Sequence, residues 1–486
     1  MEKVEPIHKL SLSKWINTSI TILLMVGVGF LPPIGTITPY GMKVVGIFLG
    51  AVYGWSTVSI AWPSFLAIVL LAFSGAMPFN TVIVSGFGTQ IVFLMILMFI
   101  VVAILDEKGV TRFLSAWVAS RKILEGRPWL FSFAILWGNA VIGGAGGGFA
   151  SLIVFFGIIA NIAERFHYQP YSRYPTLMMI GLCFSSLLGS TLFLFTGNPL
   201  ILMGAYQELT GYQANGLIYT SYALIITTLA LICYIFICKY VLKPDVRALK
   251  AIDNTIVNTN DLVLKKDQKC TLIFFAAMLI TLLLPGALPQ SSTVKALLSG
   301  LTPAGCVAFW LVIMLIIRID GQPLFNLQKA ASQGIIWDTV WISCVVLPMS
   351  GLLTSDTVGF KALLVSLLEP ILTGRSTIIF IVLVLLFSTI MTQFATNTII
   401  GLIFIPIIYS FSVTMSFNAV PILVLMLISI HLAVLTPAAS PWAALLFGNT
   451  QWLKPGDIYK YGIIFTLILL MLLTLIGYPL ATILFK

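Results

Sequence analysis

The stretch 376–418 constrains the fold more than any other, because two apolar arms flank a short polar segment, 392–398. Each arm has about 15 residues, and a helix of that length measures roughly 22 Å against roughly 30 Å of bilayer hydrocarbon. Neither arm is expected to span alone, so the run 376–415 predicts a re-entrant hairpin with its polar tip near mid-depth. Broken backbone at that depth is tolerated only inside protein or beside a wet cavity.

The composition predicts an all-α polytopic membrane protein. The chain has 486 residues, is 59% hydrophobic and 9% charged, and has a mean hydropathy of +1.07, which is more apolar surface than a soluble fold carries. The net charge of +10 does not indicate a nucleic-acid partner, because Lys and Arg fall in short loops between apolar runs. The six cysteines lack the spacing of a metal site and are interpreted as small hydrophobic residues.

The apolar runs predict about 11 transmembrane helices and a second re-entrant hairpin at 129–163. The segment 1–41 holds the first span, which is interpreted as retained because no small-residue cleavage site precedes it. Non-spanning stretches are expected at 107–128 and 355–375. The expected spans lie near 15–32, 42–57, 58–77, 89–106, 174–194, 217–242, 270–288, 303–317, 335–354, 420–435 and 462–485.

The charge distribution supports one orientation. With the N-terminus inside, all 26 Lys and Arg residues lie on the cytoplasmic side except Lys43, Lys295, Lys361, Arg375 and Lys486. This is the distribution that the positive-inside rule requires. The sequence therefore predicts a plasma-membrane protein with a cytoplasmic N-terminus and an external C-terminus.

The chain divides into two similar halves, 42–243 and 270–486, joined by a polar cytoplasmic linker at 244–269. Each half has a re-entrant hairpin followed by a broken span, 174–208 in the first half and 420–449 in the second. The hairpins open from opposite sides of the membrane, so the halves form an inverted repeat. Paired interruptions in inverted repeats point to a shared binding site near the midplane.

The second hairpin tip offers groups for an anion and for a cation. A helix starting near 396 presents free N–H groups and positive dipole, and Asn397 and Thr398 add donors suited to an oxyanion. Oxygens of Thr392, Ala395 and Asn397 could equally hold a hard cation such as Na⁺. The alternative is a polar kink that neighbouring helices stabilise.

The first hairpin tip has no polar side chains at the aligned positions, Gly146, Gly147 and Gly148. Bare glycine backbone can form an anion-binding nest. It can equally let two helices pack closely. Asn139 lies nearby and could supply the missing amide.

Both broken spans carry hydroxyl and proline at the break: Thr196 with Asn198 and Pro199, and Thr436 with Pro437. Proline frees a backbone carbonyl that can face an ion, although kinks without ligands also occur. His431, one turn before Thr436, is either a hydrogen-bonded packing residue or a proton-coupling group. No nucleophile–base set or phosphate-binding glycine loop is apparent.

These motifs resemble the divalent anion:sodium symporter family of the ion transporter superfamily, whose members carry Ser-Asn-Thr at each tip and Thr-Pro in each broken span. The second half matches at 395–398 (Ala-Thr-Asn-Thr) and at Thr436 and Pro437, and the early scaffold region matches at 54–63. In the first half three glycines replace Ser-Asn-Thr, which removes side-chain ligands for a second sodium ion and for one end of the substrate. The resemblance implies a homodimer with scaffold and transport domains and an elevator motion.

Together these features predict a sodium-coupled transporter of small organic anions such as dicarboxylates, with membrane lipid around it and no organic cofactor. A proton-driven carrier or an anion exchanger of the same fold is the alternative, and a membrane-embedded enzyme or channel is a remote one. The expected sodium ligands are Thr392, Ala395, Asn397 and Gly146. The expected substrate-binding residues are Asn397, Thr398, Gly147, Gly148, Thr196, Asn198, Thr436 and Pro437.

Overall fold

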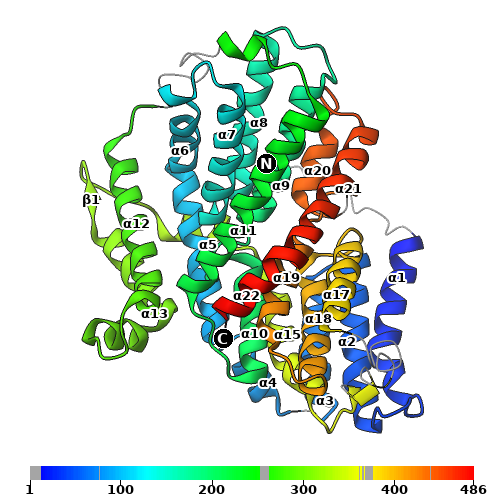
Figure 1. The fold of residues 1–486 in the computed structure, drawn as a ribbon. Helices are drawn as coiled ribbons and strands as arrows, with labels where there is room; N and C mark the ends of the chain where they lie inside the picture. Colours follow the sequence, from blue (N-terminus) through cyan, green and yellow to red (C-terminus); the bar gives the residue numbers. More distant parts are fainter. Residues whose placement is uncertain are drawn as a thin grey trace.

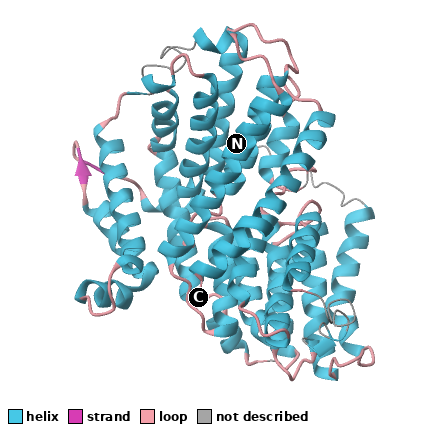
Figure 2. Ribbon diagram, viewed as in Figure 1, coloured by secondary structure: helices cyan, strands magenta, loops and turns pink. Residues whose placement is uncertain are grey.

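The computed structural model describes residues 12–75, 77–251, 262–360, 362–363, 366, 376–437 and 439–485. Within them the chain is almost entirely helical, and the strands β1 (Arg318–Ile319) and β2 (Gln322–Pro323) form one short hairpin (Figure 2). This confirms the predicted all-α fold class. Parts of the expected N-terminal segment (1–11), linker (252–261) and second non-spanning stretch (mostly 361–375) lie outside the described residues.

The helices follow one another along the chain as labelled in Figure 1. They are α1 (Leu12–Ile22), α2 (Pro39–Thr57), α3 (Ala61–Phe73), α4 (Phe79–Ser85), α5 (Gln90–Glu107), α6 (Val110–Ala119), α7 (Pro128–Ile142), α8 (Gly148–Arg165), α9 (Arg173–Gly189), α10 (Gly197–Thr210), α11 (Gly216–Ile237), α12 (Lys266–Ala287), α13 (Thr293–Ile316), α14 (Leu327–Gly334), α15 (Trp337–Thr354), α17 (Thr377–Met391), α18 (Asn397–Thr414), α19 (Ala419–Ile430), α20 (Pro441–Gly448), α21 (Pro455–Leu472) and α22 (Tyr478–Leu484).

Nine helices among the described residues are long and apolar enough to cross a bilayer, or ten if α14 and α15, bent by 70°, form one span. The chain is therefore a multi-pass membrane protein. Two expected spans are short helices: α3 has 13 residues and α19 has 12. Conversely, the first interrupted run reaches spanning length twice: once in Pro128–Gly146, which includes α7 and most of the segment 143–147, and again in α8. The number of eleven spans stays a prediction.

Each interrupted run is a helix, a break and a second helix. In the first run α7 and α8 are joined by 143–147, and in the second α17 and α18 are joined by 392–396. The two helices of each pair lie side by side (Figure 1). Because α18 has 18 residues rather than about 15, length alone does not decide whether it crosses the membrane. Re-entry stays a prediction, whereas the position of the break is observed.

The predicted broken spans are also interrupted. The segment 190–196 separates α9 from α10, and 431–440 separates α19 from α20. The second helix after each break begins where the sequence allows it. Pro441 stands in the first turn of α20, where its missing N–H costs nothing, and the Ser440 hydroxyl accepts from the Ala443 N–H at 3.1 Å.

The centre of the molecule is built on α9 and α19. Every residue of α19 is buried, and α9 is buried from Tyr174 to Gly189. The pair α7 and α8 packs on α9, and the pair α17 and α18 packs on α19. Each predicted hairpin therefore packs on the helix that opens its own half's broken span. The two halves share this arrangement, and the inverted repeat itself stays a prediction. The α12–α13 pair and the α1–α3 group lie at opposite edges (Figure 1).

Candidate functional site

The tip between α17 and α18 gathers polar groups in a buried position. The Thr392 hydroxyl lies 2.7 Å from Asn397 Oδ1 and 2.9 Å from the Ile430 carbonyl oxygen, and it can donate to either. Asn397 is 8% exposed. Because its oxygen accepts from Thr392, its NH₂ group points elsewhere and has no acceptor among the described residues. The tip thus holds a cluster of three oxygens beside a free amide donor.

The start of α18 adds backbone donors to this amide. Its N-cap, Thr396, makes no side-chain capping bond, so the first N–H groups of the helix lack an acceptor within the described part of the chain. Free N–H groups at a helix N-terminus favour an anion, and the helix dipole adds to the attraction. The position of Asn397 and Thr398 therefore suits a carboxylate or another oxyanion.

A chain of hydrogen bonds joins this tip to the first broken span. Thr398 Oγ1 donates to Asn198 Oδ1 at 2.6 Å, and Asn198 Nδ2 lies 3.1 Å from His431 Nε2. The other ring nitrogen, His431 Nδ1, lies 2.7 Å from the Leu427 carbonyl oxygen. Since a carbonyl only accepts, Nδ1 carries the proton and Nε2 accepts from Asn198. His431 is therefore a neutral imidazole with both ring nitrogens in hydrogen bonds, and it fixes the orientation of the Asn198 amide.

Gln393 connects the same tip to the second broken span by hydrogen bonds. It is not among the site residues predicted from the sequence. Its Nε2 donates to the carbonyls of Thr389 (2.9 Å) and Leu432 (2.8 Å), and its Oε1 accepts from the Leu435 N–H at 2.9 Å. Its own carbonyl accepts from the Thr436 hydroxyl. A glutamine inside a long apolar run is the signal that could have found it, because a buried amide needs partners.

The predicted break residues therefore differ in role. The Thr436 hydroxyl is bound to the hairpin tip, whereas Pro437 is exposed. Thr196 occupies the N-cap position of α10 without a side-chain capping bond and is 9% exposed, with its hydroxyl 3.4 Å from the Phe193 carbonyl. Asn198 lies in the first turn of α10, just after the first break, and accepts a hydrogen bond from Thr398 at the start of α18.

The first tip is closed by backbone and hydroxyl contacts. The Gly148 carbonyl accepts from Ser186 Oγ at 2.8 Å, and Ser186 Oγ accepts from Trp442 Nε1 at 2.9 Å. Gly144 packs so closely that an added Cβ would lie 2.4 Å from the Gly189 carbonyl oxygen. Close helix packing thus accounts for Gly144, while the tip remains connected to α20 through Trp442.

Asn139 does not supply an amide to this tip. Its Nδ2 donates to the Leu182 carbonyl at 2.9 Å and to Ser185 Oγ at 2.8 Å, and its Oδ1 accepts from Ser151 Oγ at 2.9 Å. Both amide protons are used to hold α7 against α9. The suggestion that Asn139 contributes a ligand was wrong, because packing between helices consumes its donors.

The two tips are connected through the two breaks. Gly189, the last residue of α9 before the first break, packs against Gly144 of the first tip, and Asn198, just after that break, accepts a hydrogen bond from Thr398. The second break binds the second tip through Thr436, and α20 just beyond it reaches the first tip through Trp442. Hydrogen bonds and close backbone packing therefore bring all four interruptions into contact, although no hydrogen bond joins the two tips directly among the described residues.

The tip chemistry fits an alkali cation better than a transition metal. The described residues contain no group of three or more His, Cys, Asp or Glu side chains that could hold a metal ion. Asn397 Oδ1 and the Ile430 carbonyl oxygen both lie within hydrogen-bond distance of the Thr392 hydroxyl, and hard cations prefer such neutral and carbonyl oxygens. The Ile430 carbonyl is an additional oxygen that the sequence did not indicate.

Gly146 provides a direct test of the first tip. Its φ is +126°, which side-chain-bearing residues rarely adopt, and an added Cβ would lie 2.5 Å from Val102 Cγ2. We expect Gly146→Ala to lower the free energy of unfolding by about 1–3 kcal/mol, measured by thermal melting in detergent. Gly157→Ala is the control, because Gly157 lies in α8 with open space around it. Equal melting temperatures for the two variants would contradict this account.

The family model of the sodium:sulfate symporter transmembrane region matches residues 12–485. The chain belongs to the sodium:sulfate symporter family. This confirms the resemblance to divalent anion:sodium symporters and makes the chain a member of a family of anion transporters in which sodium is the coupling ion. No curated protein sequence matches this symporter.

A solved structure supports the fold of this symporter. The YdaH transporter of Alcanivorax borkumensis superimposes with a TM-score of 0.59 at 13% sequence identity, and the match covers 97% of each chain. At this identity the likeness concerns the fold alone.

Proposed function

We propose that the chain is a sodium-coupled secondary active transporter of small organic anions, of which dicarboxylates are the preferred class. The observation that carries this proposal is the environment of Asn397. Its amide and the α18 N-terminus offer unpaired donors to an anion, while its oxygen belongs to the cluster with Thr392 and Ile430 that suits sodium. One residue thus links the two ligands.

The other roles follow from position. Thr392, Ala395, Asn397 and Gly146 are the proposed sodium ligands. The anion is held by Asn397, Thr398 and Asn198 on one side and by the backbone of Gly147 and Gly148 on the other. Thr196, Thr436 and Pro437 shape the breaks around it. Because all these groups are neutral, a bound anion keeps its charge uncompensated until sodium binds beside it.

Coupling follows from this charge balance. An anion alone in a site of low dielectric is costly, and sodium a few ångströms away offsets that cost. The fully loaded carrier can therefore cross, whereas the half-loaded one is held back. We propose that the crossing is an elevator movement of the hairpins and broken spans relative to a scaffold, within a homodimer in the plasma membrane. The interlocked contacts through Asn198, Gln393 and Trp442 favour movement of these elements as one body.

A proton-driven carrier is the second candidate, because His431 is the ionisable residue of the network. Its ring nitrogens are both engaged, however, and a second proton would break the bond to Asn198. This geometry favours a positioning role over proton transfer.

Uptake into proteoliposomes tests the proposal. The panel comprises succinate, malate, citrate, a monocarboxylate, sulfate and a sulfonate, each with a sodium gradient, a proton gradient or neither. We expect saturable uptake of a dicarboxylate that is at least tenfold faster with sodium. Uptake that follows the proton gradient alone would replace sodium as the driving ion, and preference for sulfate would overturn the substrate class. Uptake that does not saturate would contradict a carrier.

A further inference from the structure

A second polar region lies away from the network of tips and breaks, at the C-terminal end of α5. A cavity of about 490 Å³ opens there between α5, α6, α8 and the start of α12. The predicted topology places this end on the cytoplasmic side. The lining residues that carry charge or amide groups are Asp106, Glu107, Lys108, Arg112, Lys265 and Gln268.

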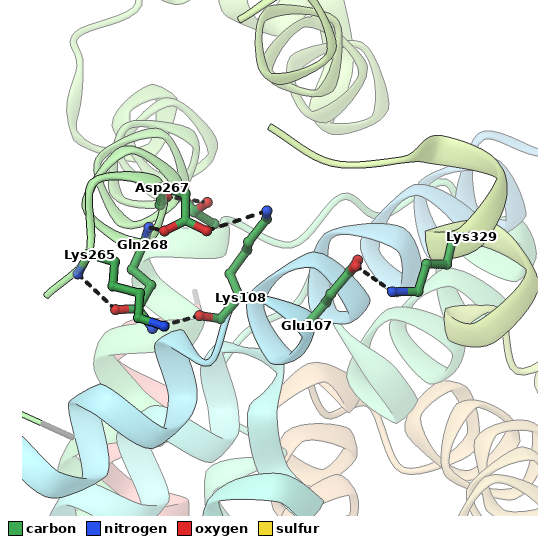
Figure 3. Close-up of polar contacts among 7 residues, drawn as sticks. Glu107, Lys108, Lys265, Asp267, Gln268 and Lys329 are labelled. Atoms are coloured by element: carbon green, nitrogen blue, oxygen red, sulfur yellow. Dashed lines mark hydrogen bonds and ion pairs between the residues drawn. The ribbon is translucent and has the colours of Figure 1, made fainter. Parts of the chain in front are cut away.

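Two charged residues of the lining, Glu107 and Lys108, are already engaged in ion pairs (Figure 3). Glu107 Oε1 lies 2.6 Å from Lys329 Nζ of α14, and Lys108 Nζ lies 3.5 Å from Asp267 of α12. Gln268 Nε2 also donates to the Lys108 carbonyl at 2.8 Å. These contacts tie adjacent residues of α5 to two different helices. They therefore fix the position of α5 relative to α12 and α14. Each of the two ion pairs has no net charge.

The remaining charges favour an anion. Arg112 and Lys265 have no ion-pair partner among the described residues, whereas the single remaining carboxylate, Asp106, accepts from Thr111 Oγ1 at 2.8 Å. The N-terminus of α6 faces the same space, and its N-cap, Gly109, provides no side-chain acceptor. Two free cations and a helix N-terminus together outweigh one carboxylate.

The cavity begins close to the first tip. Its wall on the α8 side is Ala150, Ile153 and Val154, and α8 starts at Gly148. Outside the lining, Gly146 of the first tip packs against Val102, which lies one helical turn before the lining residue Asp106 in α5. The first tip and the cavity therefore share neighbouring turns of α5 and α8.

We propose that this cavity is an anion-staging site, in which Arg112, Lys265 and the α6 N-terminus hold the transported anion between the first tip and the cytoplasm. The proposal rests on the proposed function, because it assigns the anion the same path. A positively charged, partly enclosed cavity raises the local concentration of an anion, and salt weakens the effect. The site adds a charged capture step to a binding network built of neutral groups.

The charge of the cavity is tested independently of transport with Ala150→Cys. Its reaction rate with an anionic methanethiosulfonate is compared with that of a cationic one in purified full-length protein, with the parent chain labelled in parallel. We expect Arg112→Gln with Lys265→Gln to lower the anionic-to-cationic rate ratio about fivefold or more, and 1 M salt to reduce this difference. The control replaces Lys239 and Lys454, which lie outside the cavity lining, with Gln.

Protection then tests occupancy. Succinate and sulfate are added during labelling of Ala150→Cys, and the better protector is expected to need at least fivefold higher concentration once Arg112 and Lys265 are replaced. An unreactive cysteine, an unchanged rate ratio, an equal effect in the control pair, or no protection would each overturn the staging site. Because the proteoliposome panel uses the parent chain, absence of anion uptake there would instead reject the proposed function.

Discussion

Replacing Asn397 with alanine is expected to reduce sodium-driven anion uptake to background. The change removes the unpaired amide donor and one oxygen of the cluster with Thr392 and Ile430. Hydrogen bonds to charged groups contribute about 1.5–3 kcal/mol each. The loss of one such bond to the anion and one contact to sodium therefore lowers transport by roughly two orders of magnitude. The measurement is initial uptake in proteoliposomes under a sodium gradient.

The variant is expected to remain folded, because Thr392 keeps the Ile430 carbonyl as an acceptor. Size-exclusion elution and melting temperature should match those of the parent. Thr414→Ala serves as the control on the same helix, since its hydroxyl bonds only to Ser410 one turn earlier. Uptake by Asn397→Ala close to the parent rate would remove this site assignment, whereas a misfolded protein would show instead that Asn397 supports structure.

The sequence located the breaks well because their causes are local. A polar segment between apolar arms ends α17 at Met391 and starts α18 at Asn397. A run of glycines permits the φ of +126° at Gly146. Helix length was harder to predict, because α18 continues through Pro406 to Thr414. A proline inside a helix removes one hydrogen bond, and neighbouring helices in a membrane compensate for it.

The partners of the site residues could not be predicted, because they are distant in sequence. Asn198 and Thr398 are 200 positions apart, and nothing local to either indicates the other. Gln393 donates to backbone carbonyls, which every helix offers, and Trp442 donates to Ser186, which is 256 positions away in the sequence. Family resemblance identified the second half's motif, 395–398, but in the first half the glycines left the ligands undefined. The structure shows that Asn198, one of the predicted substrate-binding residues, accepts a hydrogen bond from Thr398 in the second half.

His431→Leu is expected to lower uptake roughly tenfold although the side chain need not touch the substrate. Leucine leaves the Asn198 amide without its acceptor, and an unsatisfied buried donor costs about 1–3 kcal/mol. The amide can then rotate, so Thr398 loses the oxygen to which it donates at 2.6 Å. His431→Gln is expected to retain most of the uptake, because its carbonyl oxygen can replace Nε2 as an acceptor for Asn198.

The comparison of the two variants separates positioning from proton coupling. If His431 positions Asn198, then Asn198→Ala combined with His431→Leu should lower uptake little more than Asn198→Ala alone. The reason is that both changes remove the same hydrogen bond. The readout is initial uptake at a fixed sodium gradient, with and without a proton gradient. If His431→Gln instead abolished a proton-driven component while sodium-driven uptake persisted, the imidazole would be a proton carrier. A positioning role for the neutral His431 ring predicts two results. His431→Gln should retain uptake, and the losses in the double variant should be non-additive.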